Sequence, residues 1–182
     1  MKILIISNLF QPNQIGGYEI ACRDTAILLS AENNKLCILT SRHPSCGNTQ
    51  SYANADNLFE VHYKLYLHVN WNKDFPVYQL SSADKNNISI FNDMLVCFDP
   101  DLIYCWNLYG LGPSFINHVA SIPSMPKVLH LMDQSLLLYE PSLKRSFNQL
   151  FNRWHATQHL KISEFTFIIY ISNFLKSKFS GF

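Results

Sequence analysis

The sequence predicts an α/β protein with a Rossmann-like parallel sheet flanked by helices. Short apolar runs of strand length alternate with amphipathic stretches of helical length, which is typical of successive βα units. The chain has 182 residues, 48% of them hydrophobic and 15% charged, so it can bury a core. No internal repeat or low-complexity linker interrupts it, and residues 1–182 are expected to form one domain.

The expected strands are short apolar runs. Residues 2–7 are apolar almost throughout, as in a central strand buried on both faces. Residues 58–67 alternate apolar and polar side chains, as in a strand with one solvated face. The other expected strands are 35–40, 102–106, 127–131 and 167–171. The polar segment 41–57 is expected to be a long loop.

The expected helices have apolar residues three and four positions apart. Residues 20–29 show this spacing. A second helix, 88–98, follows a polar stretch that ends in Asn87, a good helix cap, and stops before Pro100. Pro113 suits the first position of a further helix.

The stretch 143–161 is expected to contain an amphipathic helix with Phe and Trp on its apolar face. From Pro141 onward the chain carries six basic residues and one acidic residue, a balance of +5. A basic helix with aromatic residues suits peripheral contact with an anionic membrane surface or an acidic partner. The alternative is a solvated helix face whose aromatic residues point into the core.

Composition excludes several function classes. A formal net charge of +1 argues against a nucleic-acid partner. No apolar run reaches the roughly 18–20 residues that a membrane-spanning helix needs. The five cysteines are odd in number and lack a CxxC spacing, which indicates reduced thiols. The expected location is the cytoplasm, with contact at the inner face of a membrane if the basic stretch binds lipid.

No metal site is expected. Asp99-Pro100-Asp101 spells a D-x-D pattern, but a rigid proline separates the acids at a helix-to-strand junction. His155 and His159 stand four residues apart without the general-base Glu of a zinc protease or an evident third ligand.

The most informative segment is 5–19, where a buried strand ends, a loop with Pro12 follows, and Gly16-Gly17 opens a helix. Two residues without side chains let a ligand approach the backbone, and the first amides of the helix then face that ligand. Phosphate is the natural guest of such a site. The alternative is a flexible helix entry with no ligand.

Read with its neighbours, this segment resembles the N-terminus of family-4 glycosyltransferases, whose fold is called GT-B. The resemblance runs over nearly the whole chain. Its parts are the opening strand, Pro12, Gly16-Gly17-Tyr18-Glu19, the strand 36–41, Pro100-Asp101-Leu102-Ile103, Asn107-Leu108-Tyr109-Gly110-Leu111, the strand ending near Asp133, and Ile171-Ser172-Asn173-Phe174.

The resemblance implies an enzyme of glycan biosynthesis with two Rossmann-like domains that face a cleft. Residues 1–182 would be the N-terminal, acceptor-side domain, which is one half of a GT-B architecture, with the C-terminal donor domain absent. The complete enzyme would be a retaining transferase that moves a sugar from a nucleotide-sugar, its co-substrate, to a hydroxyl of a glycan, lipid or small molecule. It would need no cofactor, and the isolated chain would be inactive without a donor domain or partner chain.

The resemblance also implies site residues. Gly16 and Gly17 match the loop that approaches the donor diphosphate. Asn107 lies at the tip of a strand, where open α/β sheets bind ligands. Ser172 and Asn173 match the cleft edge, where they would bind a sugar hydroxyl.

Asp133 matches the acidic member of the family's His-Asp pair and is the candidate catalytic residue. The preceding position, usually histidine, is Met132, and His130 lies two residues earlier. Trp106 also replaces a frequent histidine, and with Tyr109 it would form a sugar-stacking platform. Each residue has a structural alternative: Asp133 caps the helix around 136–139, His130 belongs to the core, and the two aromatic residues are ordinary packing.

Two other functions stay open. A non-catalytic binding or assembly module, or a degenerate relic, would explain Met132 and Trp106 at positions that are usually histidine. A free-standing flavodoxin-like binder of a phosphorylated small molecule would use Gly16-Gly17 without a second domain.

Overall fold

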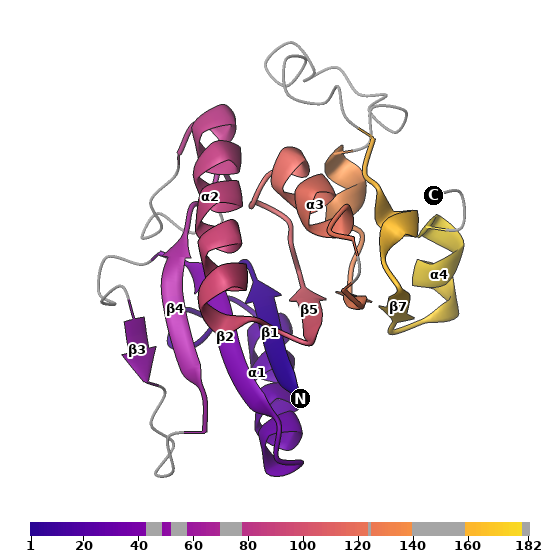
Figure 1. Ribbon diagram of the computed structural model, residues 1–182. Helices are drawn as coiled ribbons and strands as arrows, with labels where there is room; N and C mark the ends of the chain where they lie inside the picture. The colour runs from indigo at the N-terminus through magenta and orange to yellow at the C-terminus, as the bar shows by residue number, and fades with distance from the viewer. Residues whose placement is uncertain (43–48, 52–57, 70–77, 124, 140–158, 180–182) are drawn as a thin grey trace.

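A seven-stranded sheet forms the centre of the computed structural model, which describes residues 1–182 apart from 43–48, 52–57, 70–77, 124, 140–158 and 180–182 (Figure 1). The strand order is β3-β4-β2-β1-β5-β6-β7. The strands are β1 (Lys2–Ser7), β2 (Lys35–Ser41), β3 (Thr49–Ser51), β4 (Glu60–Leu65), β5 (Leu102–Trp106), β6 (Lys127–Leu131) and β7 (Phe167–Tyr170). All neighbouring pairs are parallel except β3 and β4.

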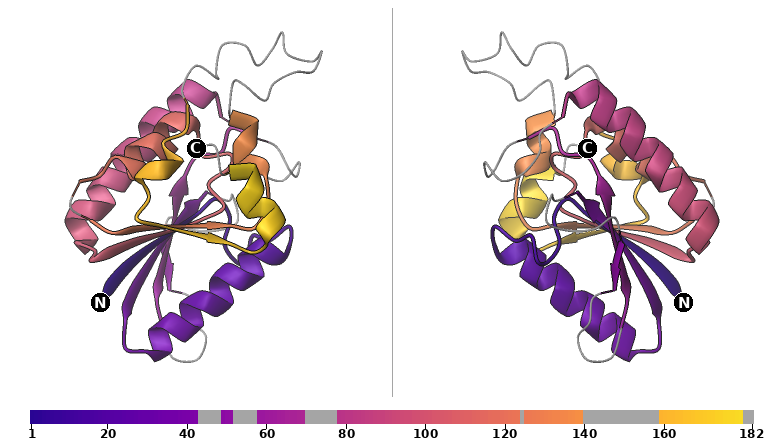
Figure 2. Two further views of the ribbon diagram at one scale, coloured as in Figure 1. Left: turned by 90° about the vertical axis from the view of Figure 1, so that its right-hand side faces the viewer. Right: turned by 90° about the vertical axis from the view of Figure 1, so that its left-hand side faces the viewer.

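Helices cover both faces of the sheet (Figure 2). The described helices are α1 (Gly17–Ala31), α2 (Leu80–Phe98), α3 (Pro113–Ala120) and α4 (Asn173–Phe179), with short 3-10 helices η1 (Ser135–Tyr139) and η3 (Ile162–Glu164). The chain leaves β1 toward β2 on one side and later returns to β5 on the other side. Because parallel crossovers share one hand, α1 and the pair α2 and α3 fall on opposite faces.

The core consists of two apolar clusters, one on each face of the sheet. Ile3 and Ile5 pack with residues of α1, while Leu4 and Ile6 pack with residues of α2 and α3. All four side chains are buried, which confirms that 2–7 is a central strand. The alternating burial of β4 confirms one half-solvated face for the strand expected at 58–67.

The sequence predicts a loop over the whole of 41–57, and this prediction is wrong in part. β2 extends to Ser41, and Thr49–Ser51 forms β3, antiparallel to β4. The strand escapes prediction because Thr-Gln-Ser carries no apolar residue, so only its pairing with β4 defines it.

The second helix begins at Leu80, eight residues earlier than the apolar stripe indicates. Asn87 is therefore not a cap but a buried residue inside α2. Its amide nitrogen donates to the carbonyls of Tyr66 and Leu111 at 2.9 Å each, and its oxygen accepts from the Tyr66 amide at 2.7 Å. These tertiary bonds outweigh the weak helix propensity of asparagine.

The predicted amphipathic helix after Pro141 falls in 140–158 and lies outside the described residues. Of the stretch 143–161, only 159–161 are described. None of the helices in the described ranges has the length and apolarity needed to span a membrane.

The described cysteines differ sharply in accessibility, which predicts selective thiol labelling. Cys22, Cys37 and Cys105 are buried, whereas Cys97 is exposed on α2, and all four are free thiols. Burial raises the pKa of Cys37 to about 12 and also raises the pKa of the Cys22 and Cys105 thiols. In a Cys46→Ser variant at pH 8, a thiol reagent should modify one cysteine quickly, and the fast site should disappear in C97S. Rapid labelling of several thiols in folded protein would contradict this burial.

Candidate functional site

A pocket lies at the carboxyl edge of the sheet, where the chain switches direction between β1 and β5. Its volume is about 160 Å³. The residues that line it come from the ends of these two strands and the start of α1: Asn8, Leu9, Ile15, Gly16, Gly17, Tyr18, Glu19 and Asn107. Open α/β sheets bind ligands at such a switch point, because connections diverge to opposite faces and leave a crevice.

Gly16 and Gly17 present bare backbone to this pocket. Both are exposed, and a Cβ atom added to either would meet no atom within 4 Å. Gly16 has extended backbone at φ −156°, so neither a tight turn nor crowding in the fold requires glycine there. The open space lies where a ligand can reach the first amides of α1.

Glu19 holds the loop before α1 in place. Its Oε2 atom accepts hydrogen bonds from the amides of Gly16 at 2.9 Å and Ile15 at 3.3 Å. Gly16, the N-cap, has no side chain to accept from the first helical amides. The first amides of an α-helix point out of its N-terminus and lack partners inside the helix, so those of Gly17 and Tyr18 suit an anionic oxygen in the pocket that both residues line.

Tyr18 connects the start of α1 to the end of β6. Its hydroxyl accepts a hydrogen bond from the Met132 amide at 2.6 Å. Burial, and then the charge of Asp133, raises the pKa of this phenol. The hydroxyl therefore stays protonated at neutral pH, and the contact fixes the glycine loop against the neighbouring strand end.

Two asparagines at adjacent strand ends shape the other wall. The Asn8 amide donates to the carbonyl of Asn107 at 3.1 Å, and Asn8 Nδ2 donates to the carbonyl of Tyr109 at 2.8 Å. Asn107 has φ +23°, a conformation that asparagine tolerates better than most residues. The structure thus brings Asn107 together with Gly16 and Gly17 in one pocket.

Tyr109 and His130 lie outside the lining of this pocket. The Tyr109 ring packs against Tyr139 with ring centroids 5.3 Å apart. His130 packs at a tilt against Trp106 with ring centroids 3.9 Å apart, and its Nδ1 is 2.9 Å from the Tyr104 hydroxyl. Burial lowers the pKa of His130, so its ring is neutral at pH 7. These contacts match the packing alternatives for the two residues.

Asp133 is exposed just beyond β6, and its Oδ1 accepts from the Ser135 amide at 2.8 Å. This bond at the start of η1 matches the capping alternative. Ser172 and Asn173 are exposed at the end of β7, on the same edge of the sheet but two strands away from Asn107.

Asn8 is a pocket residue that the sequence did not indicate, and Tyr18 and Glu19 entered the family resemblance without an expected role. Asn8 directly follows the central strand, just as Asn107 follows its neighbour β5, and that repeated pattern was the available signal. The Tyr18 contact with Met132 joins residues 114 positions apart, so no local sequence pattern predicts it.

A second, larger cavity of about 590 Å³ lies between α2 and the strands β2 and β4. Its lining includes Glu60, His62, Asp93 and Cys97. His62 Nε2 lies 3.4 Å from Glu60 Oε1, and burial lowers the pKa of this histidine. This cavity is larger, but no helix begins at it and no bare backbone lines it. Within the described residues, no three His, Cys, Asp or Glu side chains gather in a way that could hold a metal ion.

Comparison with known proteins supports the fold. No protein-family model and no curated protein matches the chain. Among solved structures, it is similar to sucrose-phosphate synthase from Thermosynechococcus elongatus, with a TM-score of 0.56 and 13% sequence identity. The match covers 87% of this chain and 40% of that chain, so the present chain spans less than half of the synthase's length.

At this identity the likeness shows the fold alone. It confirms the predicted class, a Rossmann-like sheet flanked by helices that matches a GT-B glycosyltransferase. The chain therefore shares the fold of the matched part of the synthase.

Proposed function

We propose that the chain is the acceptor-side domain of a retaining family-4 glycosyltransferase. In the complete enzyme, a sugar would pass from a nucleotide-sugar to a hydroxyl of a glycan, lipid or small molecule. A donor-binding domain or partner chain would supply the other wall of the cleft, and residues 1–182 alone would not transfer sugar. The expected setting is glycan biosynthesis in the cytoplasm, with peripheral membrane contact through 143–161.

The observation that carries this proposal is the unfilled space above Gly16 and Gly17. Residues with side chains adopt both the extended backbone of Gly16 and the helical backbone of Gly17, so the bend itself does not require two glycines. A ligand that touches the backbone does, because a side chain would occupy its place. A diphosphate fits this position, since two helical amides and the positive end of the α1 dipole face it.

The chemistry follows from the leaving group. Sugar transfer from a nucleotide-sugar releases a diphosphate, and fixed donors that meet its growing charge lower the barrier. Gly17 and Tyr18 would supply such donors from this side of the cleft. Asp133, exposed at the end of β6, would contact the reacting sugar or the acceptor, and Ser172 and Asn173 would bind acceptor hydroxyls.

An NMR titration of the isolated chain with pyrophosphate and with UDP-glucose tests the proposal. We expect amide shifts at Gly17 and Tyr18 at millimolar ligand and none at Cys97, which lines the other cavity. Gly17→Val should abolish these shifts while the fold survives, because its Cβ enters open space. Ala31→Val, exposed at the other end of α1, is the matched control and should keep them.

Two results would overturn the proposal. Unchanged shifts in G17V would mean that no ligand approaches the glycines. Micromolar binding of UDP-glucose by calorimetry would mean that this chain forms a complete donor site without a second domain.

A non-catalytic binding module is the second candidate. It is favoured by Met132 at the position where the family has histidine, and by His130 being engaged with Tyr104 and Trp106 instead. A complete enzyme and a binding module separate in one assay. Asp133→Asn in the protein joined to its donor domain should abolish sugar transfer if Asp133 is catalytic, and should leave ligand binding unchanged.

A further inference from the structure

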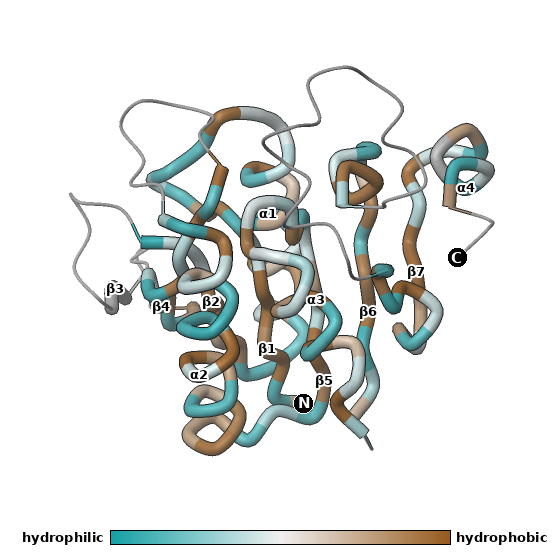
Figure 3. The backbone as a smooth tube through the Cα atoms, turned by 90° about the horizontal axis from the view of Figure 1, so that it is seen from above, coloured by the Kyte–Doolittle hydropathy of each residue, from teal (hydrophilic) through white to brown (hydrophobic). Residues whose placement is uncertain are grey.

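The two edges of the sheet differ in how they are protected. β3 is three polar residues long and ends the sheet on one side. β7 ends it on the other side, and its sequence Phe-Ile-Ile-Tyr has no charge, proline or glycine (Figure 3). Soluble proteins usually shield edge strands with such residues, because a free edge accepts another strand. β7 has none of these safeguards.

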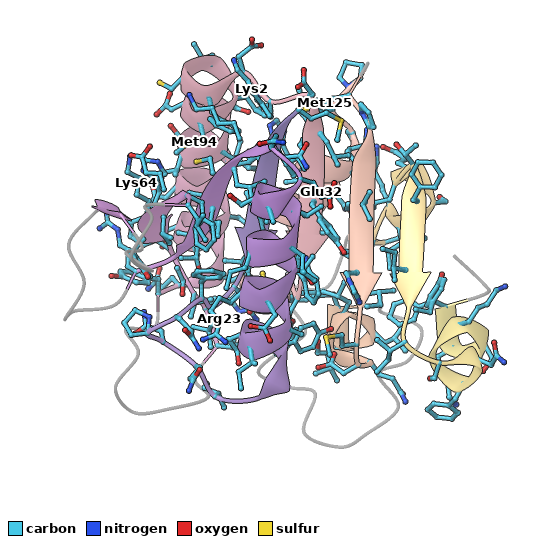
Figure 4. All side chains as sticks on the ribbon, turned by 90° about the horizontal axis from the view of Figure 1, so that it is seen from below. Lys2, Arg23, Glu32, Lys64, Met94 and Met125 are labelled. Carbon is cyan, nitrogen blue, oxygen red and sulfur yellow. The ribbon has the colours of Figure 1, made fainter. Side chains whose placement is uncertain are left out.

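None of the described helices covers one face of β7. In Figure 4, α1 lies in front of β1 and its neighbours, whereas no helix of the described residues lies in front of β6 and β7. Phe167, Ile169 and Ile171 share this face and are 63%, 40% and 56% exposed. Side chains of β-branched and aromatic type at this exposure are typical of an interface rather than of a solvated edge.

The free edge of β7 has hydrogen-bonding groups to offer. The Ile171 amide donates to the carbonyl of Leu131 at 3.4 Å, so it points toward β6. The direction of the main-chain N–H and C=O groups alternates along a strand. Those of Phe167 and Ile169 therefore also point toward β6, and those of Ile168 and Tyr170 point away from it, toward the free edge. Within the described part of the chain, β7 pairs with no strand besides β6.

We propose that β7 is a self-association surface that pairs antiparallel with β7 of a second copy. A two-fold axis through Ile169 pairs both the outward main-chain groups and the exposed side chains of the strand. Ile168 then exchanges main-chain hydrogen bonds with Tyr170 of the other copy, and Phe167 faces Ile171 across the axis, while the two Ile169 side chains meet at it. Aromatic and β-branched cross-strand pairs of this kind stabilise antiparallel sheets.

The exposed apolar strip is large enough to be the centre of a dimer contact. With Phe174, which is exposed three residues after Ile171, the exposed apolar side chains amount to roughly 400 Å² per copy. A standard interface buries about 800 Å² per partner, so the strip supplies about half. The main-chain groups of the two paired edges are buried together with it. The contact is closed by its symmetry, so association stops at two copies.

Sedimentation of the purified chain over about a hundredfold range of concentration tests association. The wild type should form a dimer, and Ile169→Lys should weaken it by about tenfold or more, because two like charges would meet at the axis. Val96→Lys, at an 82% exposed position on α2, is the matched control and should dimerise as wild type does. A monomeric wild type, or equal weakening by both variants, would overturn the proposal.

Disulfide trapping tests the register in a C46S/C97S background. Ile169→Cys should cross-link under mild oxidation, because directly opposed residues in a non-hydrogen-bonded pair lie about 4.5 Å apart at Cα. Phe167→Cys should not, since the two copies of that residue are about 13 Å apart in this register. Efficient trapping of F167C but not I169C would overturn the pairing, as would binding of an unrelated extended peptide to β7 with no dimer.

Discussion

Gly112→Ala is expected to lower the free energy of unfolding by about 3 kcal/mol or more. Gly112 has φ +104° and ψ 142°, a region that residues with a Cβ avoid. A Cβ here would lie 1.8 Å from Asp84 Oδ1. That carboxylate cannot simply move away, because it accepts a hydrogen bond from the Phe115 amide at 3.0 Å and so caps α3 from α2. Urea denaturation followed by circular dichroism measures the loss.

A double-mutant cycle separates the two causes. In an Asp84→Ala background the steric contact is gone, so the added cost of G112A should fall to that of the backbone strain. Gly17→Ala is the matched control: its Cβ enters open space, and we expect a gain of about 0.4–1 kcal/mol from the stiffer unfolded chain. An equal cost of G112A in both backgrounds would show that Asp84 is not the obstacle.

Asn87→Ala should cost about 3 kcal/mol, because it leaves buried main-chain groups without partners. The side chain makes three hydrogen bonds to Tyr66 and Leu111 and thereby joins α2 to the segments that follow β4 and β5. Thermal melting should show a clear drop in Tm. The segments after both strands should also exchange their amide protons faster.

Asn86→Ala is the matched control for this effect. Asn86 is the neighbouring residue on α2 and is exposed, so its replacement should change the free energy of unfolding by no more than about 0.5 kcal/mol. If both variants lost similar amounts of unfolding free energy, the effect of Asn87 would come from helix propensity and not from its hydrogen bonds.

The fold was largely predictable because its strands are apolar and its helices amphipathic. A continuous apolar run such as 2–7 fits only a position buried on both faces. The prediction failed where contacts rather than local composition decide the structure. β3 has no apolar residue and exists through its pairing with β4, and Asn87 marks a helix interior because three distant main-chain groups need it.

The site was predictable in part for a related reason. Gly16, Gly17 and Asn107 follow strands that a doubly wound topology places side by side, so their meeting follows from strand order. His130 does not line the pocket. Side chains alternate between the faces of a strand, and that of His130 packs against Trp106. The roles of Asp133, Ser172 and Asn173 stay predictions, since position on an edge does not define chemistry.

The central position of β1 has a consequence for how the chain acquires its structure. β1 contacts β2 and β5, and the Lys2 amide donates to Asp101 Oδ2 at 2.7 Å across 99 positions. During synthesis the central strand β1 is therefore made before both of its neighbours. Its second edge stays unpaired until β5, beyond residue 100, has been made. Contacts so distant in sequence slow folding. Until β5 emerges, the nascent chain exposes the apolar strand β1, to which chaperones can bind.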